Sequence, residues 1–135
     1  MHIIGNGIDL VGLVRFQQRM AMYREQHMLS TLFTDGELQY AGEGVHQVQR
    51  LAGIFAAKEA VLKALGTGWV DDIAWTDVEV GLSATGSPVV VLHCETAALA
   101  DSRGISQWML SISNSDSFAV ASVIASGHGG KEVEH

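Results

Sequence analysis

One uninterrupted run, LAGIFAAKEAVLKALGTG at positions 51–68, constrains the fold of this chain more than any other segment. Nearly all of its residues favour a helix, and no proline interrupts it. Its apolar residues recur at the three- and four-residue spacing of a buried helix face: Leu51, Ile54, Phe55, Val61, Leu62 and Leu65. Gly66 then stands where a left-handed cap residue ends a helix. We therefore predict a long central helix that begins near Val45 and ends at Gly66.

Three charged residues, Lys58, Glu59 and Lys63, interrupt this apolar surface. Glu59 and Lys63 are four residues apart, so they can form a solvated pair worth about 0.3–0.5 kcal/mol. Alternatively, Glu59 leaves the helix at the edge of the core-facing stripe and presents its carboxylate to a site. The helix alone favours the first interpretation.

The segment IIGNGIDLV near the N-terminus has the alternating character of a β-strand. Asp9 ends this apolar strand on a face that Gly5 and Gly7 keep clear. Together with Glu59 it would place two carboxylates at one cleft, which suits Mg²⁺ held by one or two acids and by substrate phosphates. The exit segment at 66–68, Gly-Thr-Gly, could let a bulky ligand approach the backbone closely.

The remaining segments predict a mixed architecture. A helix is expected over 14–28, a capping box opens a short helix at 34–37, and an Ala-rich helix spans 96–102. Strands are expected over 78–82 and 89–92, joined as a hairpin, and over 108–113 and 118–124. No internal repeat or domain boundary is evident. We therefore predict an α+β fold: a single small domain whose antiparallel sheet packs around the long central helix.

The charge balance excludes several classes of partner. Eight Lys and Arg residues against 15 Asp and Glu give a net charge of −7, which argues against nucleic-acid binding. Any site for phosphate or for an acidic protein must be a local basic patch, and the densest one is the helix carrying Arg15, Arg19 and Arg24. Only 17% of the residues are charged, which points to an oligomer that covers apolar surface.

The cysteine content, the apolar runs and the missing motifs constrain the cellular compartment and the possible cofactors. Cys94 is the only cysteine, so no disulfide framework is possible and a reducing cytoplasm is expected. The chain starts without the basic segment of a secretory leader, and no apolar run approaches the roughly 20 residues that span a bilayer, so no membrane partner is expected. The six histidines lack metal-ligand spacing, and the phosphate-binding motif of P-loop proteins is absent.

Two motifs together carry a resemblance to a known family. GIDLVGLVRF at 7–16 and FAAKEAVLKALGTG at 55–68 resemble the holo-[acyl-carrier-protein] synthase family of 4′-phosphopantetheinyl transferases. The family pattern is roughly G-x-D-[IL]-x(4)-R, followed some forty residues later by F-[AS]-x-K-E-[AS]-x(2)-K-A-[LI]-G. The similarity extends from Ile3 to about Ala125. It implies a 4′-phosphopantetheinyl transferase-like domain at 1–125, followed by a flexible tail at 126–135.

The resemblance also implies an activity. Members transfer the 4′-phosphopantetheine group of coenzyme A to a serine of an acyl carrier protein, in fatty acid or polyketide biosynthesis, and they act as trimers with the site between neighbouring subunits. Asp9 and Glu59 would ligate Mg²⁺. Glu59 and Lys63 would be the catalytic residues, with either Glu59 or a metal-bound water as the base.

The remaining roles follow in the same way. A group of residues would bind coenzyme A: Lys58, Lys63, Gly66, Thr67, Gly68 and Asn114. Arg15 follows the first motif as the family's carrier-docking arginine does, and Arg24 extends the same basic patch.

Three positions depart from the family pattern. Ile54 stands where members usually have an arginine, Ser87 where they often have a lysine, and Asn114 where they usually have a histidine. In the family, the arginine and the histidine normally help to hold the nucleotide phosphate or its surroundings. A charge-assisted hydrogen bond of this kind is worth about 1.5–3 kcal/mol where it is desolvated. Binding of the nucleotide is therefore expected to be either weakened or compensated elsewhere.

Three functional hypotheses follow. The first is an active phosphopantetheinyl transferase, and retention of Asp9, Glu59 and Lys63 favours it because a pure scaffold has no need of all three. The second is a non-catalytic trimeric module that binds the carrier protein. The third keeps the fold and the metal but acts on a phosphopantetheine-bearing thioester already attached to the carrier.

Overall fold

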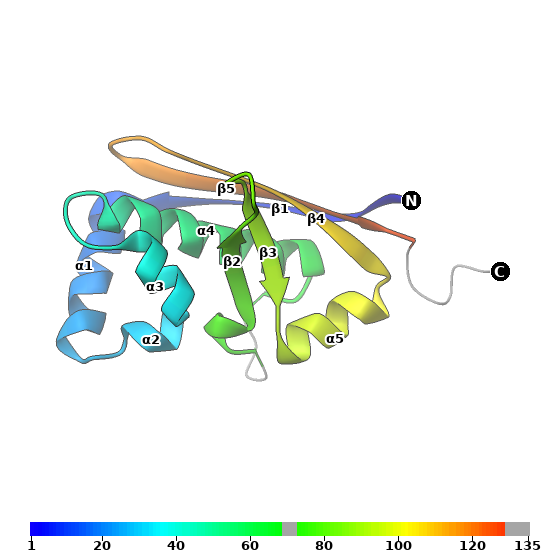
Figure 1. Ribbon diagram of the computed structural model, residues 1–135, viewed down its shortest axis with the longest axis horizontal. Coiled ribbons are helices and arrows are strands. Elements are labelled where there is room, and N and C mark those ends of the chain that lie inside the picture. Colours follow the sequence, from blue (N-terminus) through cyan, green and yellow to red (C-terminus); the bar gives the residue numbers. More distant parts are fainter. Residues whose placement is uncertain (69–72, 129–135) are drawn as a thin grey trace.

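The computed structural model describes residues 1–68 and 73–128 (Figure 1). The helices are α1 (Leu13–Glu25), α2 (Leu29–Leu32), α3 (Asp35–Ala41), α4 (Gln47–Leu65) and α5 (Cys94–Ser102). The strands are β1 (His2–Gly12), β2 (Val78–Leu82), β3 (Pro88–Leu92), β4 (Ile105–Asn114) and β5 (Phe118–Gly127). This is the α+β fold that the sequence predicts, with antiparallel sheets and one long helix at the centre.

The central helix α4 is buried on nearly all sides, including every apolar position from which it was predicted. It begins two residues after Val45, and Gly66 ends it in the left-handed conformation, with φ 83° and ψ 13°. The amide of Gly66 donates to the carbonyl oxygens of Leu62 and Lys63, which satisfies two carbonyls of the last turn. The helix is thus the core around which both hydrophobic clusters form.

A three-stranded antiparallel sheet in the order β1-β5-β4 covers one side of α4. The face that Gly5 and Gly7 keep clear is occupied by the helix. A Cβ at Gly7 would lie 2.0 Å from the carbonyl oxygen of Ala60, and one at Gly5 would lie 2.3 Å from that of Ala64. The two glycines therefore let the helix backbone approach the strand, and this brings the end of β1 next to the middle of α4.

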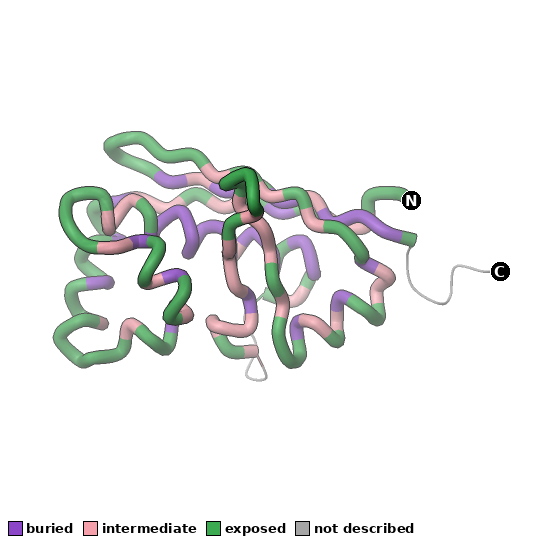
Figure 2. Tube along the Cα trace, viewed as in Figure 1, coloured by how far each residue is buried: buried purple, intermediate pink, exposed green. Residues whose placement is uncertain are grey.

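The opposite face of this sheet carries exposed apolar side chains. All helices lie on the α4 side in Figure 1, and Figure 2 shows the alternation of buried and exposed residues along the strands. Ile8 and Leu10 of β1 are 62% and 61% exposed, and Met109 of β4 is 50% exposed. In β5 the alanines face α4 while Val120 and Ile124 point the other way. No element of the described residues covers this apolar face.

The hairpin β2-β3 forms a second small sheet, as predicted. Next to it, α3 begins with the predicted capping box: the Thr34 hydroxyl accepts from the Glu37 amide, and the Glu37 carboxylate accepts from the Thr34 amide. Helix α5 begins two residues before the expected 96, and it connects the hairpin to β4.

Two local expectations need correction. Strand β5 continues through Gly127, which pairs with His2 and Ile105, so the first two residues of the expected tail belong to the sheet. The short helix α2 and a 3₁₀ turn at Trp75–Asp77 are elements that the sequence did not predict. The sequence also predicts a loop over 69–77, of which residues 69–72 lie outside the described residues, as does the tail beyond 128. Within the described part of the chain, no helix has the length and hydropathy needed to cross a membrane.

Candidate active site

The two acids singled out by the sequence line one cleft at the β1 edge of the sheet. Asp9 comes from the end of β1 and Glu59 from the middle of α4. The other lining residues belong to the same strand, to α1 and to α4: Leu10, Val11, Gly12, Arg15, Phe16, Arg19 and Phe55. The structure therefore brings together two carboxylates that are fifty positions apart, and we call this space the acidic cleft.

Lys63 reaches this cleft from the next turn of α4. Its Nζ lies 3.0 Å from Oδ1 of Asp9 and donates to the carbonyl oxygen of Ile8 at 2.9 Å. The lysine side chain is 51% exposed, whereas that of Asp9 is only 17% exposed. An exposed ion pair contributes little to folding, about 0–1 kcal/mol. The Lys63 ammonium can therefore exchange Asp9 for a substrate anion at small cost.

The donor set matches what Mg²⁺ requires of a protein. Among residues 1–68 and 73–128, no three His, Cys, Asp or Glu side chains gather into a site that could hold a metal by themselves. Mg²⁺, however, is usually bound by one or two carboxylates together with substrate phosphates. Asp9 and Glu59 supply that number of carboxylates in one cleft. Their role as ligands remains a prediction.

Lys58, expected among the coenzyme A-binding residues, lies elsewhere. Its side chain is 0% exposed and its ammonium is 2.8 Å from Oε1 of Glu37, which is also fully buried. It also donates to the carbonyl oxygens of Trp75 and Val78. Since an ammonium has three donors, all of them are used. Lys58 therefore holds α3, α4 and β2 together, and the expectation that it touches the nucleotide is wrong for this arrangement.

Burial has the larger effect on the charge of this lysine. It lowers the pKa of Lys58 from the ordinary value of 10.5, because water no longer solvates the ammonium, while the neighbouring Glu37 carboxylate acts in the opposite direction. The carboxylate in turn accepts from the backbone amide of Val80 at 2.8 Å. The pair is part of a closed hydrogen-bond network inside the fold.

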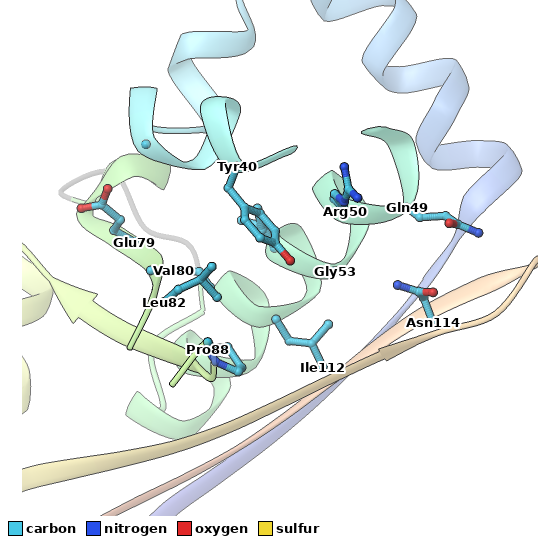
Figure 3. Close-up of a pocket in the computed structure, with 14 residues that line it drawn as sticks. Tyr40, Gln49, Arg50, Gly53, Glu79, Val80, Leu82, Pro88, Ile112 and Asn114 are labelled. Atoms are coloured by element: carbon cyan, nitrogen blue, oxygen red, sulfur yellow. The ribbon is translucent and has the colours of Figure 1, made fainter. Parts of the chain in front are cut away.

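A second cleft of about 410 Å³ opens at the β4 edge of the sheet (Figure 3). We call it the hairpin cleft because β2 and β3 form one wall, and α3, α4 and β4 form the others. Its lining includes Ile54 and Asn114, and Gly86 and Pro88 on either side of Ser87. Two of the three positions that depart from the family pattern therefore line one cavity, and the third, Ser87, lies between two residues that line it.

The charged groups of the hairpin cleft lie at its two ends in Figure 3. Glu79 is held by the Thr34 hydroxyl at 2.8 Å and by Nε2 of His93 at 2.9 Å. These two hydrogen bonds lower the pKa of the Glu79 carboxyl below its ordinary value, His93 contributing most. Arg50 lies at the other end, near Gln49 and Asn114.

The glycine-rich exit of α4 falls outside both clefts, whereas one of the two docking arginines lines the acidic cleft. Gly66, Thr67 and Gly68 follow the C-terminal end of α4 and line neither cleft. There the Thr67 amide donates to the carbonyl oxygen of Leu62 at 3.2 Å, which completes the helix cap. Arg15 is exposed on α1 and lines the acidic cleft, and Arg24 hydrogen-bonds to the side chain of Gln47.

Several features of these sites were not predicted from the sequence. The burial of Lys58 is one of them, although a signal for it was present. Lys58 lies four residues after Ile54 and four before Leu62, so the helical period places it on the buried stripe. Arg50 carried no motif, and only the packing of the hairpin against α4 makes it part of a cavity. Arg19 likewise stacks over the ring of Phe55, with its guanidinium carbon 5.3 Å from the ring centre.

Comparisons with known proteins agree over almost the whole chain. The family model of the 4′-phosphopantetheinyl transferase superfamily matches residues 5–123. A holo-[acyl-carrier-protein] synthase of Koribacter versatilis is 38% identical over 122 residues, which are 90% of this chain and 97% of that protein.

Solved structures show the same similarity. The crystal structure of holo-[acyl-carrier-protein] synthase from Neisseria meningitidis has a TM-score of 0.80 at 31% identity and covers 93% of this chain and 99% of its own. A Bacillus anthracis synthase, solved in complex with CoA (3′,5′-ADP), has a TM-score of 0.73 at 32% identity and covers 93% and 98%.

Proposed function

This chain belongs to the holo-[acyl-carrier-protein] synthase family of 4′-phosphopantetheinyl transferases, and we propose that it transfers the phosphopantetheine arm of coenzyme A to a serine of an acyl carrier protein. One observation carries the proposal: Asp9 and Glu59 line a single cleft, with the Lys63 ammonium 3.0 Å from Asp9. Two acids in a cleft, with an exposed ammonium beside one of them, are the groups that phosphoryl transfer from a pyrophosphate needs.

In the proposed reaction the serine oxygen forms a bond to the phosphorus next to the pantetheine. The phosphoanhydride bond of coenzyme A breaks, and adenosine 3′,5′-bisphosphate leaves with the bridging oxygen. Lys63 neutralises charge on the pyrophosphate as a point charge. The serine proton passes to a base, either the Glu59 carboxylate or a water molecule, and the exposure of the cleft is compatible with both.

Asp9 and Glu59 would hold Mg²⁺. When bound, this ion would polarise the pyrophosphate and neutralise the charge that develops on it. Both acids are carried by rigid elements, one at the end of a strand and one in the middle of the central helix. This placement fixes the direction of the two carboxylates before substrate arrives, which lowers the entropic cost of assembling the site.

The two clefts suggest how coenzyme A is divided between subunits. The acidic cleft lies at the β1 edge of the sheet and the hairpin cleft at the β4 edge, and they share no lining residue. We place the pyrophosphate at the acidic cleft of one subunit and the adenosine end in the hairpin cleft of its neighbour. The segment at 66–68 would pass against the pantetheine arm.

A homotrimer would also cover the exposed sheet face. Ile8, Leu10 and Met109 are at least half exposed there, next to Val120 and Ile124. A contiguous apolar face on a monomer usually marks an interface. We propose that three copies meet through this face. A sedimentation experiment that gives a monomer at micromolar concentration would contradict the shared site.

The carrier protein would dock on α1. Arg15 lines the acidic cleft and is exposed, so it can contact an acidic partner whose serine enters the same cleft. Arg24 lies farther along the same helix. We place the reaction in the cytoplasm and in fatty acid or polyketide biosynthesis, as the family resemblance implies.

The decisive experiment incubates an apo acyl carrier protein with coenzyme A, Mg²⁺ and this protein. The carrier should gain about 340 Da, the mass of one phosphopantetheine, in a metal-assisted transfer. Asp9→Asn and Glu59→Gln should abolish the gain, whereas Asp116→Asn and Glu95→Gln, at exposed positions outside both clefts, should not.

Two outcomes would contradict this assignment. Carrier binding without any mass gain would favour a non-catalytic module. Substantial Mg²⁺-dependent turnover by Asp9→Asn or Glu59→Gln would show that the substituted acid is not a metal ligand.

A further inference from the structure

Arg50 is the only arginine or lysine among the described residues that line the hairpin cleft. It is exposed on the first turn of α4, and one of its Nη atoms donates to the carbonyl oxygen of Ala41 at 3.3 Å. It forms no ion pair within residues 1–68 and 73–128. A guanidinium has five donors, so this single hydrogen bond leaves most of its hydrogen-bonding capacity for a ligand or for water.

Position 50 lies one helical turn before position 54, on the same side of α4. Ile54 is only 2% exposed and packs in the core, so it offers the cleft an apolar surface and no cation. Four residues correspond to a rise of about 6 Å, and the side chains of such a pair are neighbours. The long side chain of Arg50 can therefore bring its charge to the part of the cleft above Ile54.

Neutral donors accompany Arg50 at this end of the cleft. Gln49 and Asn114 lie at the same end in Figure 3, the Gln49 amide donating to the carbonyl oxygen of Ser115 at 3.5 Å, and the Tyr40 hydroxyl points into the cavity from α3. Glu79, the one acid among the described lining residues, lies at the opposite end of the view and is bound by Thr34 and His93. A cation with amide and hydroxyl donors around it is suited to a phosphate group.

From this arrangement we infer that Arg50 binds the 3′-phosphate of coenzyme A, so that the cation missing at position 54 is supplied one turn earlier. The inference rests on the proposed function, which places the pyrophosphate at the acidic cleft and leaves the 3′-phosphate as the remaining anion of the substrate. The apolar walls of the hairpin cleft, among them Val80, Pro88 and Ile112, suit the adenine ring next to it.

The same arrangement makes Arg50 a specificity determinant. Coenzyme A and 3′-dephospho-coenzyme A differ by this single phosphate. A charge-assisted contact in a partly enclosed cleft should favour coenzyme A by about tenfold or more. An enzyme without any cation for this phosphate would bind the two ligands equally.

The test is a calorimetric titration of both ligands into four proteins: wild type, Arg50→Gln, Ile54→Arg and the double variant. Arg50→Gln should lose about tenfold in affinity for coenzyme A and change less than about twofold for the dephospho ligand. Ile54→Arg should add little to wild type but should recover affinity for coenzyme A in the Arg50→Gln background. This pattern is expected only if the two positions serve the same phosphate.

A fourth variant keeps the test valid if Arg50→Gln is unstable in a thermal melt. Arg50→Lys preserves the charge and loses the planar fork, so it should bind coenzyme A with an affinity between those of wild type and the neutral variant. For a folded variant, equal losses for both ligands, or no loss for either, would overturn the inference.

The inference and the proposed function fail in different ways. If wild type modifies the carrier protein but does not distinguish the two ligands, the role of Arg50 is wrong and the transferase assignment stands. If wild type binds neither ligand and leaves the carrier unmodified, both the proposed function and the inference about Arg50 are wrong.

Discussion

Two lysines of α4, five positions apart, form ion pairs of opposite character. Lys58 and Glu37 are 0% exposed, and the ammonium donates to two backbone carbonyls as well. Lys63 and Asp9 are 51% and 17% exposed at the rim of the acidic cleft. The first pair is enclosed and saturated, so it can act only on the fold. The second can open toward a ligand, so it can act on chemistry.

This difference shows why the same residue type in one motif carries two roles. A buried pair costs desolvation, and removing one partner leaves an uncompensated charge in the core. A solvated pair costs little and is worth little. The K-E-x-x-x-K spacing in α4 is compatible with either role for each lysine. The roles differ because Lys58 is enclosed by α3 and the hairpin, whereas Lys63 lies at the exposed edge of the sheet beside β1.

The largest expected effect is on folding. Lys58→Met leaves the Glu37 carboxylate buried without its cation, and we expect the free energy of unfolding to fall by about 3–5 kcal/mol. Lys63→Met, the matched change at the exposed pair, should cost about 0–1 kcal/mol. Urea denaturation of both variants measures the difference. Equal losses would show that the two pairs are energetically alike and would break the comparison.

Transfer activity should respond in the reverse order. A phosphate contact made by the Lys63 ammonium is worth about 1.5–3 kcal/mol, so Lys63→Met should slow transfer by about 10- to 150-fold while the protein stays folded. Glu37→Gln, where folded, should retain a much larger share of the rate, because Glu37 touches neither cleft. Steady-state rates at saturating coenzyme A, corrected for the folded fraction, decide the matter. If the Lys63→Met variant transferred phosphopantetheine faster than the Glu37→Gln variant, the buried pair would be the one that matters for catalysis and the exposed pair would not.

A smaller effect, on recognition of the carrier protein, is expected from Arg15 at the acidic cleft, because this exposed charge acts through solvent. Arg15→Gln should raise KM for an acidic carrier protein several-fold at low ionic strength and leave the affinity for coenzyme A unchanged. The increase should shrink at high salt because exposed charges are screened beyond about one Debye length, roughly 3 Å at 1 M. An unchanged KM at low salt would place the docking surface elsewhere.

The smallest effect concerns the pair of intermediate exposure, Glu79 and His93, at 27% and 44%. Because hydrogen bonds lower the pKa of the Glu79 carboxyl in the folded state, the unfolded chain takes up a proton first as the pH falls. The stability that Glu79 contributes is therefore full above its unfolded pKa, near 4.5, and is lost as the pH falls through the lower folded value.

Glu79→Gln removes this contribution, which should be no more than about 1 kcal/mol. The difference in unfolding free energy between wild type and variant should be present at pH 6 and disappear in strong acid. A difference independent of pH would mean that packing, and not the carboxylate charge, is involved.

Local sequence determined much of this protein. The capping box at 34–37 and the Gly66 cap depend on contacts within four or five residues, and the apolar spacing of α4 depends only on the helical period, so all three could be predicted. The two family motifs also identified Asp9, Glu59 and Lys63 as residues worth locating together. Their meeting in one cleft needed only the expectation that the first strand lies against the central helix.

Tertiary structure decided what depends on partners distant in the chain. Gly5 and Gly7 could clear space for a ligand or for a helix, and only the approach of the Ala60 carbonyl shows that the helix takes it. Lys58 could bind substrate until Glu37, twenty-one positions earlier, is seen to enclose it. Arg50 lines a cavity only because the hairpin β2-β3 packs beside α4. Long-range packing chooses which polar groups lose water, and that choice separates structural charges from functional ones.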